Sequence, residues 1–246
     1  MNVLYRLTAT ETKLFFREPT AVFFVLAFPS LLLVILGFVP PFREPNPDIG
    51  GLRVIDLYAP IVITMAVGLL SLNMLPQLFA AYREKGILRR MATTPVRPSA
   101  LLGAQLAMAV TLSVGSALLI LAVARLGFDV ALPDNLAVYL LMYVLCLLAM
   151  LTLGLLIGSL APTAKGAAAI GSILFFPVVF FAGLWLPREQ MPEVLRRISD
   201  FTPLGAGVQS LQDATAGHWP QLLHVAVMLG WTIVAGALAA RYFRWE

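Results

Sequence analysis

Charge is scarce in this sequence. Only 12% of the residues are Asp, Glu, Lys or Arg, and 60% are hydrophobic. Ordinary soluble domains carry about 25% charged residues. The core of a soluble protein of 246 residues could not enclose that much apolar surface. The composition therefore excludes a soluble protein and indicates that lipid is the solvent for most of the chain.

Residues that carry chemistry are also few. The single cysteine, Cys146, lies in an apolar run and cannot form an intrachain disulfide, so we interpret it as a packing residue. The sequence has no P-loop, no G-x-S-x-G or H-E-x-x-H motif and no paired-cysteine metal motif. His218 and His224 are the only histidines and do not share a helical face. His224 could be a proton relay or a substrate contact, but a buried, hydrogen-bonded neutral histidine is the favoured interpretation.

No Asp, Glu, Lys or Arg lies well inside any long apolar run, except near its ends. A proton- or ion-driven transporter usually needs such a group inside its spans, and so does an intramembrane enzyme. The sequence therefore disfavours both classes and indicates an energy source outside the membrane. A membrane scaffold or sensor that binds an ATPase without moving a substrate stays an alternative.

Six uncharged stretches are long enough for the roughly 20 residues that cross a bilayer. Each is apolar all round, which favours helices, and none shows the alternating pattern of a β-barrel strand. We predict an all-α membrane protein with six transmembrane helices in a single transmembrane domain over residues 1–246. The six stretches are Thr20–Phe42, Leu57–Ala81, Ser99–Ala124, Asn135–Ala164, Gly166–Pro187 and Ala214–Ala240.

The charges that remain are distributed unequally between the two sides. With the N-terminus inside, eleven of the 17 Lys and Arg residues and four of the 13 Asp and Glu residues lie inside. The positive-inside rule therefore predicts a multi-pass protein of the cell membrane with both termini cytoplasmic. The net charge of +4 follows from this topology and does not indicate nucleic-acid binding.

Residues 1–18 precede the first span and have helical periodicity. Arg6, Lys13 and Arg17 fall within about 40° of each other on a helix, which predicts an amphipathic helix in the headgroup layer with its cations towards anionic lipid. Glu11 and Glu18 project near the apolar arc and fit this pattern poorly. An ordinary helical flank is the alternative. No cleavage site of a signal peptide follows the next apolar run. The apolar arc consists of Val3, Leu4, Leu7, Leu14 and Phe15.

The segment 82–98 is a basic loop between the second and third apolar stretches. It contains five of the 17 Lys and Arg residues and two prolines, which is typical of a cytoplasmic connection. We expect a short helix in the Tyr82–Met91 region to contact a soluble partner. Its polar rim would be Glu84, Lys85, Arg89 and Arg90 around an apolar centre of Ile87, Leu88 and Met91. A mere topology signal is the alternative.

The segment 187–213 on the outer side is too long for a hairpin. Pro192 suits the first turn of a helix, and Val194, Leu195, Ile198 and Phe201 share one face of it. The sequence Thr-Pro-Leu-Gly then breaks the helix, and a second short helix is expected over Ala206–Asp213. Two short helices between long spans predict a segment that re-enters the outer leaflet.

Uncharged polar residues occur inside the second stretch. They are Thr64, Ser71, Asn73 and Gln77, of which Asn73 and Gln77 are four apart and share a helical face. They could line a substrate path, although bonding between helices is slightly favoured. In the fourth stretch, Gly154 and Gly158 form a small-x-x-x-small pattern suited to close helix contact.

The basic loop and the outer segment both contain motifs that resemble those of a known family. Arg83-Glu-Lys-Gly-Ile-Leu-Arg-Arg-Met-Ala-Thr-Thr-Pro-Val is similar to the coupling-helix loop of the permease subunits of type-2 ATP-binding-cassette exporters. Leu186-Pro-Arg-Glu-Gln-Met-Pro with Phe201-Thr-Pro-Leu resembles the outer re-entrant helices of that family. The amphipathic start resembles its interfacial helix. The resemblance covers nearly the whole chain.

The resemblance implies a permease that is not itself an enzyme and is driven by two copies of a separate ATP-binding-cassette ATPase. That partner would bind ATP and Mg, so this chain would need no cofactor of its own. A second permease copy, identical or related, and membrane lipid would complete the assembly. The implied coupling site is Arg83, Glu84, Lys85, Gly86, Ile87, Leu88, Arg89, Arg90 and Met91, and the implied outer gate is Leu186, Pro187, Pro192, Phe201 and Pro203.

The cargo is left open by the residues themselves. Short loops and little cytoplasmic mass resemble the compact drug-resistance permeases, so we expect export of a hydrophobic or amphipathic drug-like molecule. Export of a polysaccharide or a lipid-linked glycan is the alternative. Tyr and Trp lining a wide channel would favour a glycan, but these residues lie mainly near span ends.

Overall fold

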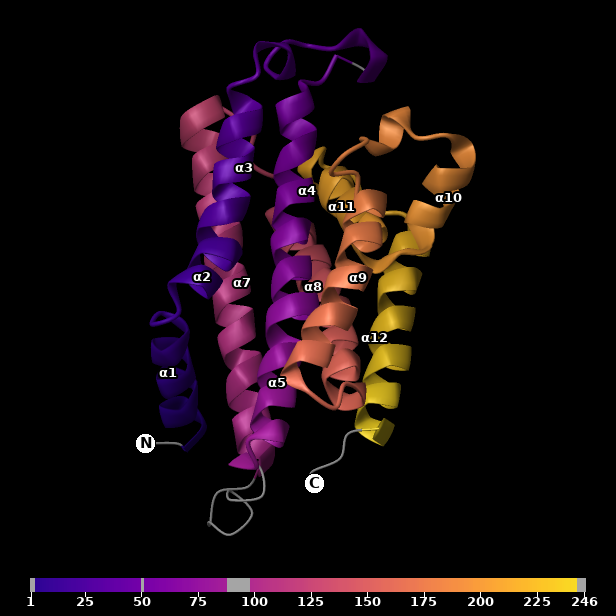
Figure 1. Ribbon diagram of the computed structural model, residues 1–246. Helices are drawn as coiled ribbons and strands as arrows, with labels where there is room; N and C mark the ends of the chain where they lie inside the picture. Colours follow the sequence, from indigo (N-terminus) through magenta and orange to yellow (C-terminus); the bar gives the residue numbers. More distant parts are fainter. Residues whose placement is uncertain (1–2, 50, 88–97, 243–246) are drawn as a thin grey trace.

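A computed structural model describes residues 3–49, 51–87 and 98–242 of the chain. These residues form a bundle of long helices that run side by side, with no strand longer than one isolated bridge among them (Figure 1). Six helices are long and apolar enough to cross a membrane, as predicted. They are Pro19–Gly37, Val54–Glu84, Ala100–Phe128, Leu136–Leu160, Ala164–Phe181 and Leu222–Tyr242.

The first two of these spans are each built from three helical elements. In chain order, the elements of the described residues are α1 Val3–Phe15; α2 Pro19–Val22, η1 Phe23–Ala27 and α3 Phe28–Gly37; η2 Pro40–Phe42 and η3 Pro47–Ile49; α4 Val54–Gly68, η4 Leu69–Met74 and α5 Leu75–Glu84; α7 Pro98–Phe128, α8 Leu136–Leu160 and α9 Ala164–Phe181; η5 Arg188–Gln190, α10 Glu193–Phe201 and α11 Pro203–Thr215; and α12 Leu222–Tyr242.

The two ends of the bundle differ in what they carry. The start of α1, the ends of α5, α8 and α12, and the starts of α7 and α9 lie at one end, which we call the terminal end (Figure 1). The short helices η2, η3, η5 and α10 lie at the other end, which we call the opposite end. Both termini of the chain therefore lie at the terminal end, as an even number of spans requires.

Three predicted span boundaries are wrong, each where glycine or proline stops a helix. The sixth span begins at Leu222 and not at Ala214, because α11 ends at Thr215 and Gly217 has a φ of +77°. The fifth ends at Phe181 and not at Pro187, since Gly183 turns the chain with a φ of +93°. The first ends at Gly37, before the Pro-Pro pair that opens η2.

The second span, made of α4, η4 and α5, lies at the centre of the bundle. Its most apolar window is 89% buried inside the protein, against 17% to 50% for the other five spans. Helices α3, α7, α8, α9 and α11 surround it (Figure 1). The other spans therefore present most of the surface that lipid or a second copy can contact.

A π-helical segment interrupts each of the first two spans just before a proline. Proline has no N–H to donate to the carbonyls four and five residues earlier, which frees those carbonyls. In the first span Pro29 follows η1, and the carbonyl of Val25 instead accepts a hydrogen bond from Ser116 Oγ of α7 at 2.9 Å. Ser116 thus gives the Val25 carbonyl a hydrogen bond that Pro29 cannot donate.

In the second span Pro76 follows η4, and the freed carbonyls are those of Ser71 and Leu72. They lie against Gly154 of α8 and Gly171 of α9. A Cβ atom on Gly154 would lie 2.0 Å from the oxygen of Ser71, and one on Gly171 would lie 2.0 Å from that of Leu72. The predicted close packing at Gly154 is therefore confirmed, and only glycine fits at both positions.

The segment 187–213 contains two short helices, α10 and α11, as predicted, but α11 is longer than expected. It begins at Pro203, directly after Thr202, whose hydroxyl accepts a hydrogen bond from the Gly205 amide at 3.1 Å. Most of α11 is buried among the spans, whereas Val194, Ile198 and Phe201 on the apolar face of α10 are exposed. The two helices therefore differ in their surroundings.

Candidate functional site

The last turn of α5 holds three consecutive polar side chains that bond to different parts of the chain. Tyr82 bonds to α1, Arg83 to the end of α8, and Glu84 to the start of α9. Successive side chains on an α-helix point about 100° apart, so neighbours in sequence fan out around the helix. We call Tyr82, Arg83 and Glu84 the α5 hub.

Tyr82 fastens α1 to the bundle through a buried carboxylate. Its hydroxyl donates to Glu11, with distances of 2.8 and 3.0 Å to the two carboxylate oxygens. The side-chain amide of Gln105 in α7 lies 3.5 Å from the same carboxylate. Glu11 is only 8% exposed. Helical periodicity marked Glu11 as a poor fit to an apolar arc, but it could not reveal a partner 71 residues away.

Replacing Glu11 by Ala should loosen α1 without unfolding the spans. The change leaves the Tyr82 hydroxyl and the Gln105 amide without their acceptor, at a cost of about 1–3 kcal/mol for that contact. We expect faster hydrogen–deuterium exchange throughout α1 in the Glu11→Ala protein. Glu18→Ala is the matched control, because Glu18 is exposed just after the same helix. Equal exchange in the two variants would contradict an anchoring role for Glu11.

Arg83 and Glu84 bind the two sides of the turn between α8 and α9. The Arg83 guanidinium donates to the carbonyl oxygens of Gly158 at 3.1 Å and Ser159 at 3.2 Å, and also to that of Ala161. The Glu84 carboxylate accepts from the backbone amide of Ala164 at 3.1 Å. These partners are backbone groups, so no pattern of side chains in the sequence could have predicted them.

The expected coupling residues fall into three groups. Arg83 and Glu84 end the same helix as the second span, which differs from the expected separate short helix over Tyr82–Met91. Lys85 is exposed, Gly86 ends the helix with a φ of +65°, and Ile87 is half-buried. The remaining four, Leu88, Arg89, Arg90 and Met91, lie outside the described residues.

The three cations of the predicted interfacial helix are accessible, although only Arg6 and Lys13 lie in α1. Arg6, Lys13 and Arg17 are all exposed. The residues of the expected apolar arc differ in burial, however: Phe15 is buried, whereas Leu14 is 47% exposed. Leu7 is half-buried, and the side chains of Val3 and Leu4 lie outside the described residues.

The polar residues of the second span also divide into two pairs. Thr64 and Ser71 are fully buried within this chain, and the Thr64 hydroxyl donates to the Ile61 carbonyl at 2.9 Å. Asn73 and Gln77 are half-buried. The Asn73 side-chain oxygen accepts from Ser172 Oγ of α9 at 3.1 Å, so this residue does bond two helices. Of these four residues, only Asn73 and Gln77 are accessible from outside the protein.

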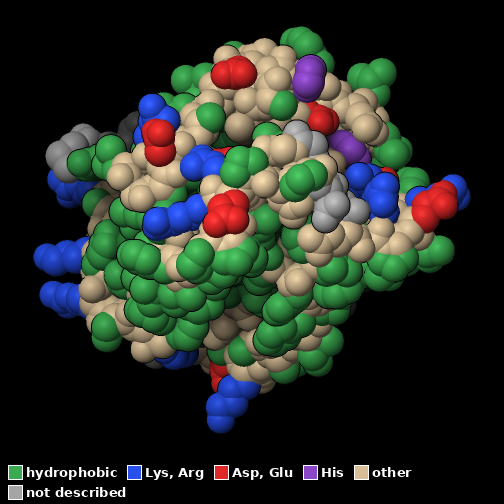
Figure 2. Space-filling model, turned by 90° about the horizontal axis from the view of Figure 1, so that it is seen from above, with side chains coloured by type: hydrophobic (Ala, Val, Ile, Leu, Met, Phe, Trp, Pro, Cys, Tyr) green, Lys and Arg blue, Asp and Glu red, His purple; other side chains and the backbone are tan. Residues whose placement is uncertain are grey.

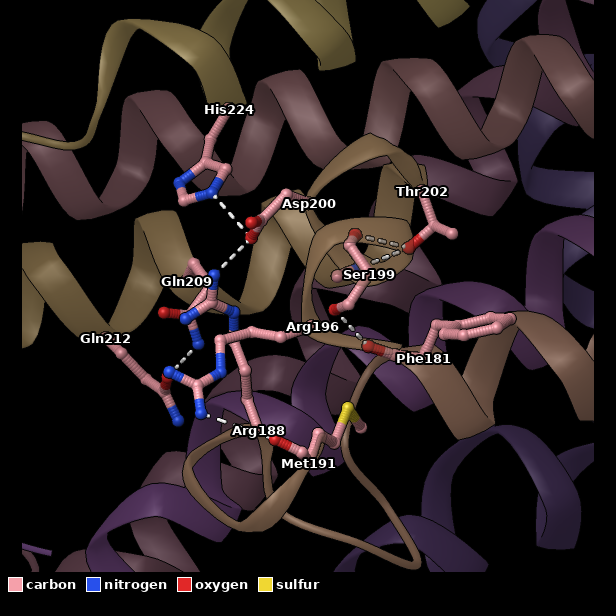
Figure 3. A network of polar contacts seen from close by, with 11 residues as sticks. Phe181, Arg188, Met191, Arg196, Ser199, Asp200, Thr202, Gln209, Gln212 and His224 are labelled. Atoms are coloured by element: carbon pink, nitrogen blue, oxygen red, sulfur yellow. Dashed lines mark hydrogen bonds and ion pairs between the residues drawn. The ribbon is translucent and has the colours of Figure 1, made fainter. Parts of the chain in front are cut away.

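A polar network at the opposite end holds α10 in place (Figure 3). Its centre is Asp200, whose Oδ1 accepts from an Arg188 Nη atom at 2.5 Å and lies 3.1 Å from His224 Nε2 of α12. The neighbouring Ser199 hydroxyl donates to the Phe181 carbonyl at 2.6 Å. His224 is 1% exposed, which agrees with the favoured interpretation of a buried, hydrogen-bonded histidine.

Charge balance in this network involves a second carboxylate. Asp213 of α11 is near enough to His224, His218 and Arg188 to interact with them electrostatically. Burial raises the pKa of Asp213 above its ordinary value, and these three neighbours oppose the shift. Seen end-on, charges of both signs and the histidines gather over this end, with hydrophobic side chains around its sides (Figure 2). No feature of the sequence marks Asp200, Arg188 or Asp213 as members of a polar network.

The expected gate residues lie around this network. Pro187 and Pro203 are buried, Leu186 is half-buried, and Pro192 is exposed. Phe201 is 60% exposed, while its carbonyl accepts from the Trp231 indole N–H of α12 at 3.0 Å. The backbone of the segment is therefore tied to the bundle even where its apolar side chains face outward.

One comparison with known proteins identifies a family for the chain. A family model described as "ABC-2 type transporter" matches residues 2–215, which is most of the chain. The comparison with curated proteins finds no match. The permease domains of this family work with ATP-binding-cassette ATPase partners. The matched region contains α1, the first five spans and both short helices α10 and α11. The chain belongs to the ABC-2 type transporter family.

Proposed function

We propose that this chain is the transmembrane subunit of an ATP-driven exporter of hydrophobic or amphipathic small molecules. The observation that carries the proposal is the family match over residues 2–215, together with six apolar spans. The sequence has no P-loop, so the hydrolytic site with its ATP and Mg would belong to a separate ATPase, present in two copies. The subunit would lie in the cell membrane.

The terminal end of the bundle would face the cytoplasm. The charge asymmetry between loops supports this orientation. Helix α1 would then lie in the inner headgroup layer, where its exposed Arg6 and Lys13, and Arg17 just after it, can reach anionic lipid. The ATPase would contact the segment that follows α5, with Lys85, Ile87 and the sequence-predicted Leu88–Met91 as its docking residues.

Two permease copies would enclose the substrate path, because one bundle of six spans has a centre filled by its own second span. The exposed surface of the described spans is mainly apolar, which suits a hydrophobic or amphipathic cargo. The half-buried Asn73 and Gln77 would supply polar contacts along that path. The segment 187–213 would gate the exit on the outer side.

The first test is co-purification of the tagged chain with the ATP-binding-cassette ATPase encoded beside it. We expect the wild type to retain the ATPase and to support vanadate-sensitive ATP hydrolysis. We expect Lys85→Glu combined with Arg89→Glu to reduce the bound ATPase by about tenfold or more, since charge reversal at a polar rim turns attraction into repulsion. Export is then measured as ATP-dependent uptake of a lipophilic fluorescent dye by inside-out vesicles.

The outcomes separate the parts of the proposal. Failure of the wild type to bind or stimulate the ATPase would contradict the exporter function. A variant that binds the ATPase as well as the wild type would move the contact away from Lys85 and Arg89. If the complex hydrolyses ATP but the vesicles do not accumulate the dye, the result would contradict export of a lipophilic small molecule and favour a different substrate.

A further inference from the structure

The charges of the α5 hub match the two helix ends that they bind. The last carbonyls of a helix carry a partial negative charge and have no partner within the helix, whereas its first amides carry a partial positive charge. Arg83 supplies a cation to the carbonyls at the end of α8, and Glu84 supplies an anion to the first amide of α9. Two adjacent residues of opposite charge thus bind two adjacent helix ends of opposite polarity.

Small residues bring the backbones together beneath these contacts. Ala80 of α5, Ala161 in the turn and Ala167 of α9 form a separate buried cluster, each with 0% exposure. A Cβ atom on Gly158 would lie 3.3 Å from the Cβ of Phe79, so α5 and α8 already touch at this level. The α8–α9 turn therefore has little room to slide against the end of α5.

The hub also lies where the chain leaves the second span. Lys85 caps α5, and Gly86 turns the chain with a φ of +65° only two residues after Glu84. A force applied to the segment that follows must pass through this turn into the last turn of α5. Tyr82 carries the same force to α1 and α7 through Glu11 and Gln105.

We propose that Arg83 and Glu84 are positioning residues that transmit movement of the coupling segment to the α8–α9 hairpin, so that the fourth and fifth spans move together with the second. This inference rests on the proposed function, because the movement is the one that the ATPase would impose. Without the two charged contacts, α5 would move past the hairpin and ATP hydrolysis would be uncoupled from the fourth and fifth spans.

A purely stabilising role for the two residues makes a different prediction. Capping alone would order the α8–α9 turn equally with and without nucleotide, and its loss would loosen the turn in both states. Transmission instead concerns whether α5 and α9 keep their separation when the ATPase closes. The distance between them in two nucleotide states therefore distinguishes the two roles.

The experiment uses spin labels at Ala81→Cys, a half-buried position one residue before the hub in α5, and at Lys165→Cys, an exposed position in the first turn of α9. Cys146, the only native cysteine, is fully buried. The label-to-label distance is measured by pulsed electron resonance in the purified permease–ATPase complex, without nucleotide and after trapping with ATP and vanadate. We compare the wild-type background with Arg83→Gln/Glu84→Gln and with the milder Glu84→Gln, which keeps an acceptor oxygen but removes the charge.

We expect one unchanged distance in the wild type and a shift on trapping in the double variant, with a smaller shift in Glu84→Gln. Arg125→Gln/Asp129→Asn, an ion pair at the opposite end whose side chains are 48% and 85% exposed, should behave as the wild type because it touches neither the hub nor the coupling segment. A wild-type distance that changes on trapping would overturn the inference, as would a double variant whose distance does not respond to nucleotide. Absence of any complex would instead contradict the proposed function and the inference with it.

Discussion

Gly154→Ala and Gly171→Ala should each lower the free energy of unfolding by about 3 kcal/mol or more. At both positions the added methyl would lie 2.0 Å from a backbone oxygen of η4, at Ser71 and Leu72 respectively. A backbone carbonyl cannot rotate away as a flexible side chain can, so α8 or α9 must move outward as a whole. The change is measured as the midpoint of thermal unfolding in detergent and as the fraction of monodisperse protein.

Glycines elsewhere in the spans provide matched controls. Gly115 of α7 and Gly230 of α12 have no neighbouring atom within 4 Å of an added Cβ. Alanine is favoured over glycine inside a helix by up to about 1 kcal/mol, so Gly115→Ala and Gly230→Ala should leave the midpoint unchanged or raise it slightly. Equal midpoints for Gly171→Ala and Gly115→Ala would show that the second span tolerates displacement of its neighbours.

Asp200→Ala should release α10 from the bundle. The substitution removes the acceptor shared by Arg188 and His224 and leaves the Arg188 guanidinium with no ion-pair partner in the described network. Breaking a buried pair in this way costs about 3 kcal/mol at the low end. The low end applies because the two side chains are still 23% and 16% exposed. Hydrogen–deuterium exchange of residues 188–201 should accelerate strongly while exchange in α4 is unaffected.

The same helix contains its own control. Glu193 and Arg197 form an ion pair of 2.5 Å, but their side chains are 73% and 77% exposed. Glu193→Ala should therefore change stability by less than about 1 kcal/mol. Asp200→Asn, which keeps the shape of the side chain and loses its charge, should lie between the two. Similar exchange in Asp200→Ala and Glu193→Ala would contradict the central position that the structure gives to Asp200.

The six spans could be predicted from the sequence because their signal is local: length, apolar composition and the lack of charge. Span ends could be predicted less closely, as at Ala214, because the residues between α11 and α12 carry no Asp, Glu, Lys or Arg that would mark where the sixth span begins. The α5 hub could not be predicted, although the sequence marked its residues. Arg83 and Glu84 bind backbone atoms more than 70 residues away, and backbone atoms leave no trace in the side-chain pattern.

The enclosed position of the second span has a consequence for biogenesis. This span enters the bilayer before α7, α8 and α9 have been synthesised, yet those three helices supply much of its final surroundings. In the interval the carbonyls of Ser71 and Leu72 face lipid, where an unpaired polar group costs several kcal/mol. We expect the nascent second span to be held by an insertase or to stay mobile until α9 arrives, because synthesis of the fifth span is the step that covers the second of these two carbonyls.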